Sequence, residues 1–189
     1  MHPESSIRVP SYLIALFLLT AALAVPGHAK PALDLVDEFD LDRYQGLWYE
    51  IALLPNRFQS RCVANTAAEY TRMANGYIRV VNRCRTADGE YDRAEGVARP
   101  ADPDRPAALK VRFVPKWLSF LPFVWGKYQV MSLDEDYRWA MVGTPSRKYL
   151  WILAREPSLP DSRIDALLGE AERQGFDVSD VERSRQDWP

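Results

Sequence analysis

The sequence predicts an all-β domain of eight short antiparallel strands, followed by one α-helix packed against the outside of the sheet. Three observations support this prediction. Short apolar runs alternate with turn residues along most of the chain, Asn75-Gly76 separates two of these runs, and one amphipathic segment follows the last run. Eight short strands in series with tight turns are typical of an antiparallel barrel or sandwich.

Alternation and turn chemistry define the strands. Asn75-Gly76 is the strongest turn signal, because a type I′ turn needs positive φ at both central residues. Asp88-Gly89 and the acidic residues 134–136 mark two further turns. The predicted strands cover residues 49–53, 64–70, 77–81, 91–98, 109–113, 128–133, 137–142 and 149–155.

A single helix is predicted after the last strand. Ser158, with Asp161 three residues later, is expected to cap its start, and Gly175 is the expected stop. The apolar positions of the segment share one helical face: Ile164, Leu167, Leu168 and Ala171. Such a helix should pack against the outside of the sheet.

The first 29 residues are predicted to be a signal peptide. Residues 13–25 are apolar except for Thr20, which is shorter than the roughly 20 residues of a membrane-spanning helix but typical of a signal-peptide core. Cleavage is expected after Ala29, which leaves residues 30–189 as the domain; an uncleaved membrane anchor is the alternative. No cysteine lies near this position to accept a lipid. The expected location is therefore periplasmic or secreted.

Composition excludes several classes of function. A net charge of −2 argues against a nucleic-acid partner, because such domains are usually strongly basic. The two histidines, His2 and His28, fall within the predicted signal peptide, so the domain lacks the commonest general base and metal ligand. No metal, cofactor or catalytic site is predicted. The carboxylate cluster at residues 134–136 is interpreted as a solvated turn.

Cys62 and Cys84 are the two cysteines of the chain. In an oxidising compartment such a pair usually forms a disulfide, which would contribute about 3 kcal/mol for a loop of this size. Two free buried thiols are the alternative.

Three motifs in order resemble those of the lipocalin family. Gly46-Leu47-Trp48, continued by Tyr49-Glu50-Ile51, resembles the G-x-W motif, as in bacterial lipocalins and apolipoprotein D. Glu135-Asp136-Tyr137 resembles the second motif, usually T-D-Y, and departs from it at the first position. Residues 149–155, which end in Arg155, resemble the third. The similarity spans residues 40 to 180 and is to the bacterial outer-membrane type, whose lipid-anchoring cysteine is missing here.

The resemblance implies an eight-stranded up-and-down barrel with a ligand cavity. It further implies that Trp48 and Arg155 meet at the closed end, a structural contact worth about 0.5–2 kcal/mol. Gly46, Asp136 and Tyr137 are assigned structural roles by the same motifs.

Strand alternation predicts which side chains face the interior. The last strand is counted from an inward Arg155, and the other strands are counted from polar residues expected to face water, such as Arg138 beside Trp139. The small residues Ala94, Gly96 and Ala98 are expected to leave room on their strand. The pattern by itself does not distinguish a filled barrel from a hollow one; the resemblance favours a cavity. The predicted ligand-binding residues are Tyr70, Phe113, Tyr128, Val130, Trp139, Met141, Tyr149, Trp151 and Leu153.

Residues 116–125, KWLSFLPFVW, form the most apolar loop. Either the loop is a flap over the barrel mouth, or residues 117–125 touch a membrane, since exposed apolar patches usually mark contacts. Cations predicted near the same rim would suit an anionic head group or a free carboxylate: Arg57, Arg61, Lys116, Lys127, Arg147 and Lys148.

The predicted function is to bind and to carry or store a small hydrophobic ligand, a fatty acid or lysophospholipid, for lipid maintenance or transport in the cell envelope. Two alternatives remain. One is an enzyme on the same scaffold, an isomerase or a lipid-modifying activity, for which Glu50 is the inward carboxylate. The other is a carrier of tyrosine-ligated haem or of a pigment.

Overall fold

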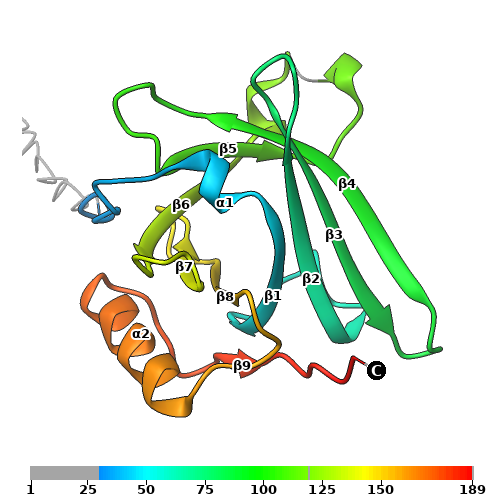
Figure 1. Ribbon diagram of the computed structural model, residues 1–189, viewed down its shortest axis with the longest axis vertical. Helices are drawn as coiled ribbons and strands as arrows, with labels where there is room; N and C mark the ends of the chain where they lie inside the picture. Colours follow the sequence, from blue (N-terminus) through cyan, green and yellow to red (C-terminus); the bar gives the residue numbers. More distant parts are fainter. Residues whose placement is uncertain (1–29, 119, 189) are drawn as a thin grey trace, which may run out of the picture.

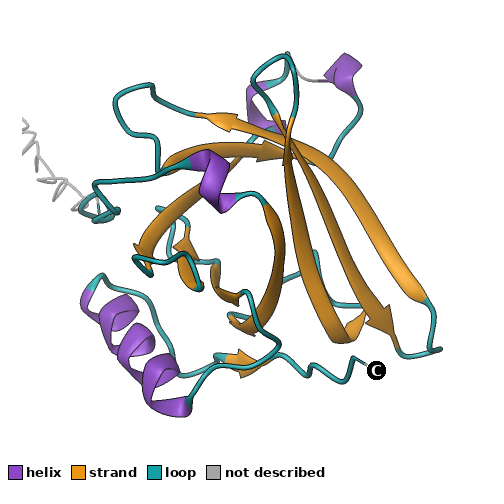
Figure 2. Cartoon of the chain, viewed as in Figure 1, coloured by secondary structure: helices purple, strands orange, loops and turns teal. Residues whose placement is uncertain are grey.

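The computed structural model describes residues 30–118 and 120–188, so the predicted signal peptide lies outside the described part. The described strands form one antiparallel sheet in the order β2-β3-β4-β5-β6-β7-β8-β1-β9, and β2 also pairs with β1. This last pairing closes eight strands into the predicted barrel and leaves β9 outside it (Figure 1, Figure 2). The strands are β1 Gly46–Leu53, β2 Cys62–Arg72, β3 Ile78–Thr86, β4 Tyr91–Pro100, β5 Ala108–Arg112, β6 Gly126–Leu133, β7 Trp139–Gly143, β8 Leu150–Ala154 and β9 Glu182–Arg183.

Two hairpins of the barrel share one turn geometry. At the β2–β3 turn, Gly76 has a φ of +79°, its N–H donates to Met73 O, and Asn75 Oδ1 accepts from Tyr77 N. The β3–β4 turn repeats this pattern with Gly89 and Asp88. Both predicted hairpins are confirmed, but the type I′ turn is not. Only the glycine takes positive φ, because the loop is longer than two residues.

The predicted contact between Trp48 and Arg155 is confirmed at the closed end. The Arg155 guanidinium carbon lies 3.9 Å from the centroid of the Trp48 ring, and the same guanidinium donates to Leu47 O and Arg43 O. Helix α1 (Leu41–Tyr44) precedes β1, and its Tyr44 is buried in the barrel interior. Gly46 has a φ of +91°, and a Cβ there would lie 3.3 Å from Arg155 Nη1. The motif therefore closes one end of the barrel.

Helix α2 (Asp161–Arg173) covers the outside of the barrel and builds a second hydrophobic core there (Figure 2). Ile164, Leu167 and Ala171 are buried as predicted, and Gly175, with a φ of +85°, follows the end of the helix. The predicted cap is wrong. The N-cap residue is Pro160, without a side-chain cap, and the helix begins immediately after it. None of the described helices is long and apolar enough to cross a membrane.

The inward orientation predicted for Trp139 and Met141 is also wrong. Both belong to the helix-side core, and their neighbours Ala140 and Val142 belong to the interior core instead. The prediction took exposed Arg138 as the outward reference, but β7 begins only at Trp139. Because α2 covers the outer face, β7 is apolar on both faces, and alternation of polarity carries no orientation there.

The C-terminal segment closes the seam between β1 and β2. The pairing of β1 with β2 ends at Tyr49 and Ala67. Beyond it, residues 184–188, here called the C-terminal strap, span the two strands: Gln186 Nε2 donates to Glu50 O at 2.6 Å and to Thr66 O at 2.9 Å. Strand β9 pairs with β1 just before the strap. Carbonyl groups where the strands separate thus find donors from the strap.

The disulfide between Cys62 and Cys84 is formed, with the two Cα atoms 5.5 Å apart. It joins the start of β2 to β3. The alternative of two free thiols is therefore dropped.

Candidate functional site

Aromatic rings fill the closed half of the barrel interior. The ring of Tyr44 lies 5.0 Å from that of Phe39, 4.6 Å from Trp48 and 5.4 Å from Tyr70, centroid to centroid. Tyr128 completes this group, since its hydroxyl lies 2.7 Å from the Tyr44 hydroxyl and 3.0 Å from that of Tyr70. We call these five residues the aromatic floor.

Burial keeps the hydroxyls of the aromatic floor protonated. It raises the pKa of Tyr70 to about 12, and it raises the pKa values of Tyr44 and Tyr128 well above their usual range. The hydroxyl groups of Tyr44, Tyr70 and Tyr128 are hydrogen-bonded to one another, as buried polar groups require. The floor therefore presents a neutral, internally satisfied surface to the rest of the interior.

The interior wall is in contact with solvent in the open half. Gly96 of β4 pairs with Val80, a member of the interior core, so Ala94, two residues earlier, lies on the same face. Ala94 is exposed. Pairing between β4 and β5 stops at Val97, and β4 extends past β5 in Figure 1. The described strands thus leave the wall at residues 91–95 open on one side.

The Phe113 ring occupies part of the space that the sequence predicts beside the small residues of β4, because it packs against Gly96. A Cβ on Gly96 would lie 2.7 Å from the Phe113 ring and 2.5 Å from Arg112 O, so only glycine allows this approach. Phe113 remains 42 % exposed. It therefore lies at the edge of the open half, with one face against the wall and another toward solvent.

A buried polar cluster lies on the opposite side of the open half. Glu50 is 4 % exposed and pairs across β1 and β8 with Leu153, an interior residue. Its carboxylate accepts from Gln59 Nε2 at 2.5 Å and from Ser184 Oγ at 2.6 Å. Gln59 Oε1 in turn accepts from Trp151 Nε1 at 2.9 Å. Desolvation by burial raises the pKa of Glu50, and the two hydrogen bonds oppose this rise.

The structure brings most of the predicted ligand-binding residues together. Tyr149 is half-buried and stacks on Trp151, with ring centroids 5.9 Å apart, and Phe113 lies at the edge of the open half. Trp139 and Met141 are excluded, because they lie beneath α2. Four of the predicted ligand-binding residues belong to the interior core, and a fifth, Trp151, packs against it: Tyr70, Tyr128, Val130 and Leu153 are the four.

The predicted rim cations divide into different environments. Arg57 and Arg61 lie in the β1–β2 loop and Lys148 in the β7–β8 turn, and all three are exposed. These two segments adjoin, because the Phe58 and Tyr149 rings are 5.5 Å apart. Arg61 forms an ion pair with Asp92 at 3.4 Å. Lys127 is exposed at the start of β6. The side chain of Lys116 is not among those that the structure describes.

Arg147 is not a rim cation, contrary to the prediction. It is buried, and its guanidinium donates to the carbonyl oxygens of Pro31, Pro145 and Gln174. The backbone reverses there with positive φ, which turns the side chain toward the end of α2. Arg147 therefore ties the N-terminal segment and the end of α2 to the β7–β8 turn.

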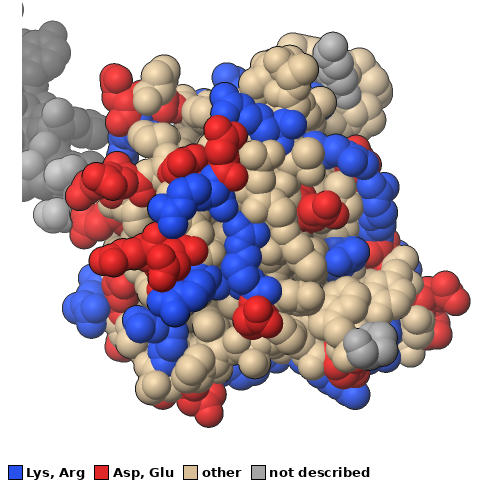
Figure 3. Space-filling model, in the orientation of Figure 1, with Lys and Arg blue, Asp and Glu red and all other residues tan. Residues whose placement is uncertain are grey.

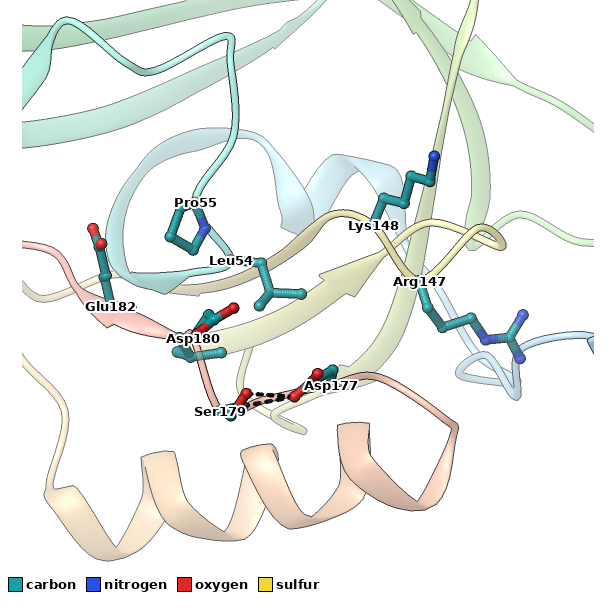
Figure 4. Close-up of a pocket in the computed structure, with 9 residues that line it drawn as sticks. Leu54, Pro55, Arg147, Lys148, Asp177, Ser179, Asp180 and Glu182 are labelled. Atoms are coloured by element: carbon teal, nitrogen blue, oxygen red, sulfur yellow. Dashed lines mark hydrogen bonds between the residues drawn. The ribbon is translucent and has the colours of Figure 1, made fainter.

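A polar pocket of about 560 Å³ lies beside Arg147, outside the barrel (Figure 4). Leu54 and Pro55 form one side, and residues 177–182 between α2 and β9 form another. Figure 4 shows Arg147 and Lys148 pointing away from its acidic residues. Mixed charge and an open shape make this pocket unsuited to an apolar ligand.

The loop at residues 116–125 exposes aromatic rings. Two short 3₁₀ helices, Lys116–Leu118 and Pro122–Val124, shape it, and Trp117, Phe120 and Phe123 are 72 %, 76 % and 80 % exposed. Figure 3 shows an uncharged lobe at the upper right, with Lys and Arg side chains below it. At the base of the loop, the guanidinium carbons of Arg99 and Arg112 lie 4.9 Å and 5.2 Å from the Trp125 ring centroid.

Sequence reasoning missed Gln59 and the C-terminal strap. Gln59 lies in an irregular loop where alternation assigns no direction, and no local pattern distinguishes it from other exposed glutamines. The strap joins residues more than 100 positions apart, such as Ser184 and Glu50. The only local sign of the strap is a run of polar residues after the helix, and such a run more often lies in solvent than against a strand.

Comparison with known proteins agrees with this architecture. Residues 39–186 match the family model described as a lipocalin-like domain. The chain is 39 % identical over 159 residues to temperature-induced lipocalin-1 of Arabidopsis thaliana, covering 83 % of this chain and 84 % of that protein. It is 39 % identical over 165 residues to the outer membrane lipoprotein Blc of Escherichia coli K12, covering 85 % and 89 %.

A further sequence relative and a solved structure of similar fold agree with these matches. Apolipoprotein D of Macaca fascicularis is 34 % identical over 149 residues, covering 75 % of this chain and 74 % of that protein. Lobster apocrustacyanin A1 superposes with a TM-score of 0.62 at 15 % identity, covering 79 % and 81 %. The family match, the closed barrel and the Trp48–Arg155 contact lead to one conclusion: this chain belongs to the lipocalin family.

Proposed function

We propose that this lipocalin binds a small hydrophobic molecule in the open half of its barrel, a fatty acid or a lysophospholipid, and carries or stores it. The observation that carries the proposal is the inward face of β4, where Ala94 is exposed although it points to the interior. Relatives named as an outer membrane lipoprotein and as apolipoprotein D support a lipid-related role. The protein would act by binding and not by catalysis.

The tail of such a ligand should set its affinity. Burying an acyl chain gains about 0.8 kcal/mol per CH₂, part of which offsets the cost of association. An exposed ion pair at the mouth, for example with Arg57 or Lys148, contributes at most about 1 kcal/mol. The cations should therefore bias the choice of head group without deciding whether the ligand binds.

The cell envelope is the proposed location. Residues 1–29 would act as a signal peptide, cleaved after Ala29, and release the domain into the periplasm or the medium. The disulfide supports an oxidising compartment, and the outer membrane relatives support an envelope role.

Two tryptophans provide the test. Trp151 packs against the interior core, whereas Trp139 lies outside, with the Arg163 guanidinium 4.9 Å from its ring. A fluorescent fatty-acid probe should bind saturably, be displaced by lysophospholipid and quench tryptophan emission. Trp151→Phe should remove much of the quenching, and the matched Trp139→Phe should retain it. Absence of saturable binding by the probe and by lysophospholipid would overturn the proposal.

We further propose that residues 117–125 contact a membrane surface. Their exposed aromatic rings are the kind that anchors at lipid interfaces. Arg99, Lys110 and Lys127 lie directly opposite one another on neighbouring strands, and none has an ion-pair partner among the described residues. Adjacent like charges are destabilising, and an anionic lipid surface would relieve them.

Vesicle sedimentation tests this contact. The protein should sediment with phosphatidylglycerol vesicles, and the double variant Trp117→Ser, Phe123→Ser should remain in the supernatant. Met73→Ser is the control, because Met73 is also exposed but lies in the β2–β3 turn. Equal sedimentation of the wild type and the double variant would contradict membrane contact through the loop.

A further inference from the structure

The side-chain amide of Gln59 lies between a hydrogen-bond acceptor and a donor on two different strands. Its Nε2 is 2.5 Å from Glu50 Oε2 on β1, and its Oε1 is 2.9 Å from Trp151 Nε1 on β8. Gln59 itself belongs to the β1–β2 loop, outside any strand. A side chain from a loop thus satisfies two polar groups of the barrel wall, the Glu50 carboxylate and the Trp151 indole N–H.

The orientation of this amide is fixed by its partners. An indole N–H only donates, and an ionised carboxylate only accepts. Oxygen must therefore face Trp151, and the NH₂ group must face Glu50. Asn56 Nδ2, from the same loop, also donates to Gln59 Oε1 at 2.9 Å. Any group that replaces the Gln59 amide needs an acceptor on one side and a donor on the other.

Glu50 also determines the charge that this position accepts. The carboxylate is 4 % exposed, its partners Gln59 and Ser184 are uncharged, and no described Lys or Arg forms an ion pair with it. When it is ionised, this carboxylate repels a second negative charge strongly, because neither a counter-charge nor solvent screens the pair. A free carboxylate is thus disfavoured here, whereas a neutral donor is favoured.

We infer that Glu50 and Trp151 form a head-group subsite for neutral amphiphiles, which the Gln59 amide occupies until a ligand displaces it. The ligand class is a long-chain molecule whose head pairs a hydrogen-bond donor with an acceptor, as a primary fatty amide does. This inference rests on the proposed binding of a hydrophobic molecule in the barrel. It adds that the β1–β8 side of the open half selects the head group by hydrogen bonding.

Oleamide and oleate provide the test, because they share one chain and differ in the head group. By isothermal titration calorimetry at an alkaline pH, where Glu50 and oleate are both ionised, the wild type should bind oleamide about tenfold or more tightly than oleate, the scale of one hydrogen bond to a charged group. Glu50→Gln should reduce this preference to about threefold or less, since it removes the negative charge. Gln59→Ala should tighten oleamide binding by removing the internal competitor.

Glu69→Gln serves as the matched control, because Glu69 is exposed on β2, and it should keep the wild-type preference. Circular dichroism verifies that each variant is folded; if Glu50→Gln is not, the wild-type preference and Gln59→Ala decide the question. Equal affinities for the two ligands, unchanged by Gln59→Ala, would overturn the subsite and leave the proposed function intact. Failure of both ligands and of lysophospholipid to bind would overturn both.

Discussion

At the scale of single residues, burial makes the carboxyl group of Glu50 a weaker acid. Its carboxyl group lies in the barrel wall, where desolvation raises its pKa and the hydrogen bonds from Ser184 and Gln59 only partly compensate. Strand alternation in the sequence predicts that Glu50 points inward, because it lies two residues after Trp48. The hydrogen-bond partners were not predictable, since they come from a loop and from the distant C-terminus.

Glu50 should make the stability of the protein depend on pH. Because its pKa is raised in the folded state, the native protein holds this proton at pH values where the unfolded chain has lost it. Glu50 therefore reduces stability as pH rises above its unfolded pKa, until it is ionised in both states. Glu50→Gln should gain stability relative to the wild type as the pH rises above about 4, the unfolded pKa of a glutamate, toward the raised pKa of Glu50 in the folded protein. Urea denaturation of both proteins at each pH measures this difference, and a relative loss would contradict the assignment.

At the scale of elements, sequence patterns predicted the strands better than the orientation of one of them. All eight barrel strands were identified, because tight turns and alternating polarity are local signals. Strand β7 was misoriented, since α2 makes its outer face as apolar as its inner one. The helix start was also misplaced: a capping residue was sought at Ser158, whereas Pro160 sets the boundary.

The packing of α2 can be tested at one position. Leu167 is 2 % exposed within the helix-side core, so Leu167→Ala should reduce the free energy of unfolding by about 2–4 kcal/mol. Leu168→Ala removes the same atoms from a half-buried position and should cost clearly less. Because α2 lies outside the barrel, both variants should retain ligand affinity at temperatures where they are folded. Equal losses of stability in thermal or urea unfolding would contradict this packing.

At the scale of the whole molecule, the barrel has a closed half and an open half. The aromatic floor fills the first, and the Trp48–Arg155 contact seals its end. The C-terminal strap bridges β1 and β2 and holds Glu50 through hydrogen bonds from Ser184 and Gln186. A ligand would therefore enter beside the β1–β2 loop and stop above the aromatic floor, which limits the depth that its tail can reach.

Occupancy of the barrel is the central claim, and native mass spectrometry of delipidated protein tests it most directly. After incubation with lysophospholipid or oleamide, the spectrum should show one bound molecule per chain. An excess of either ligand should not populate a second tight adduct, because a single binding site is proposed above the aromatic floor. A spectrum that shows only the bare mass with every ligand would contradict the account.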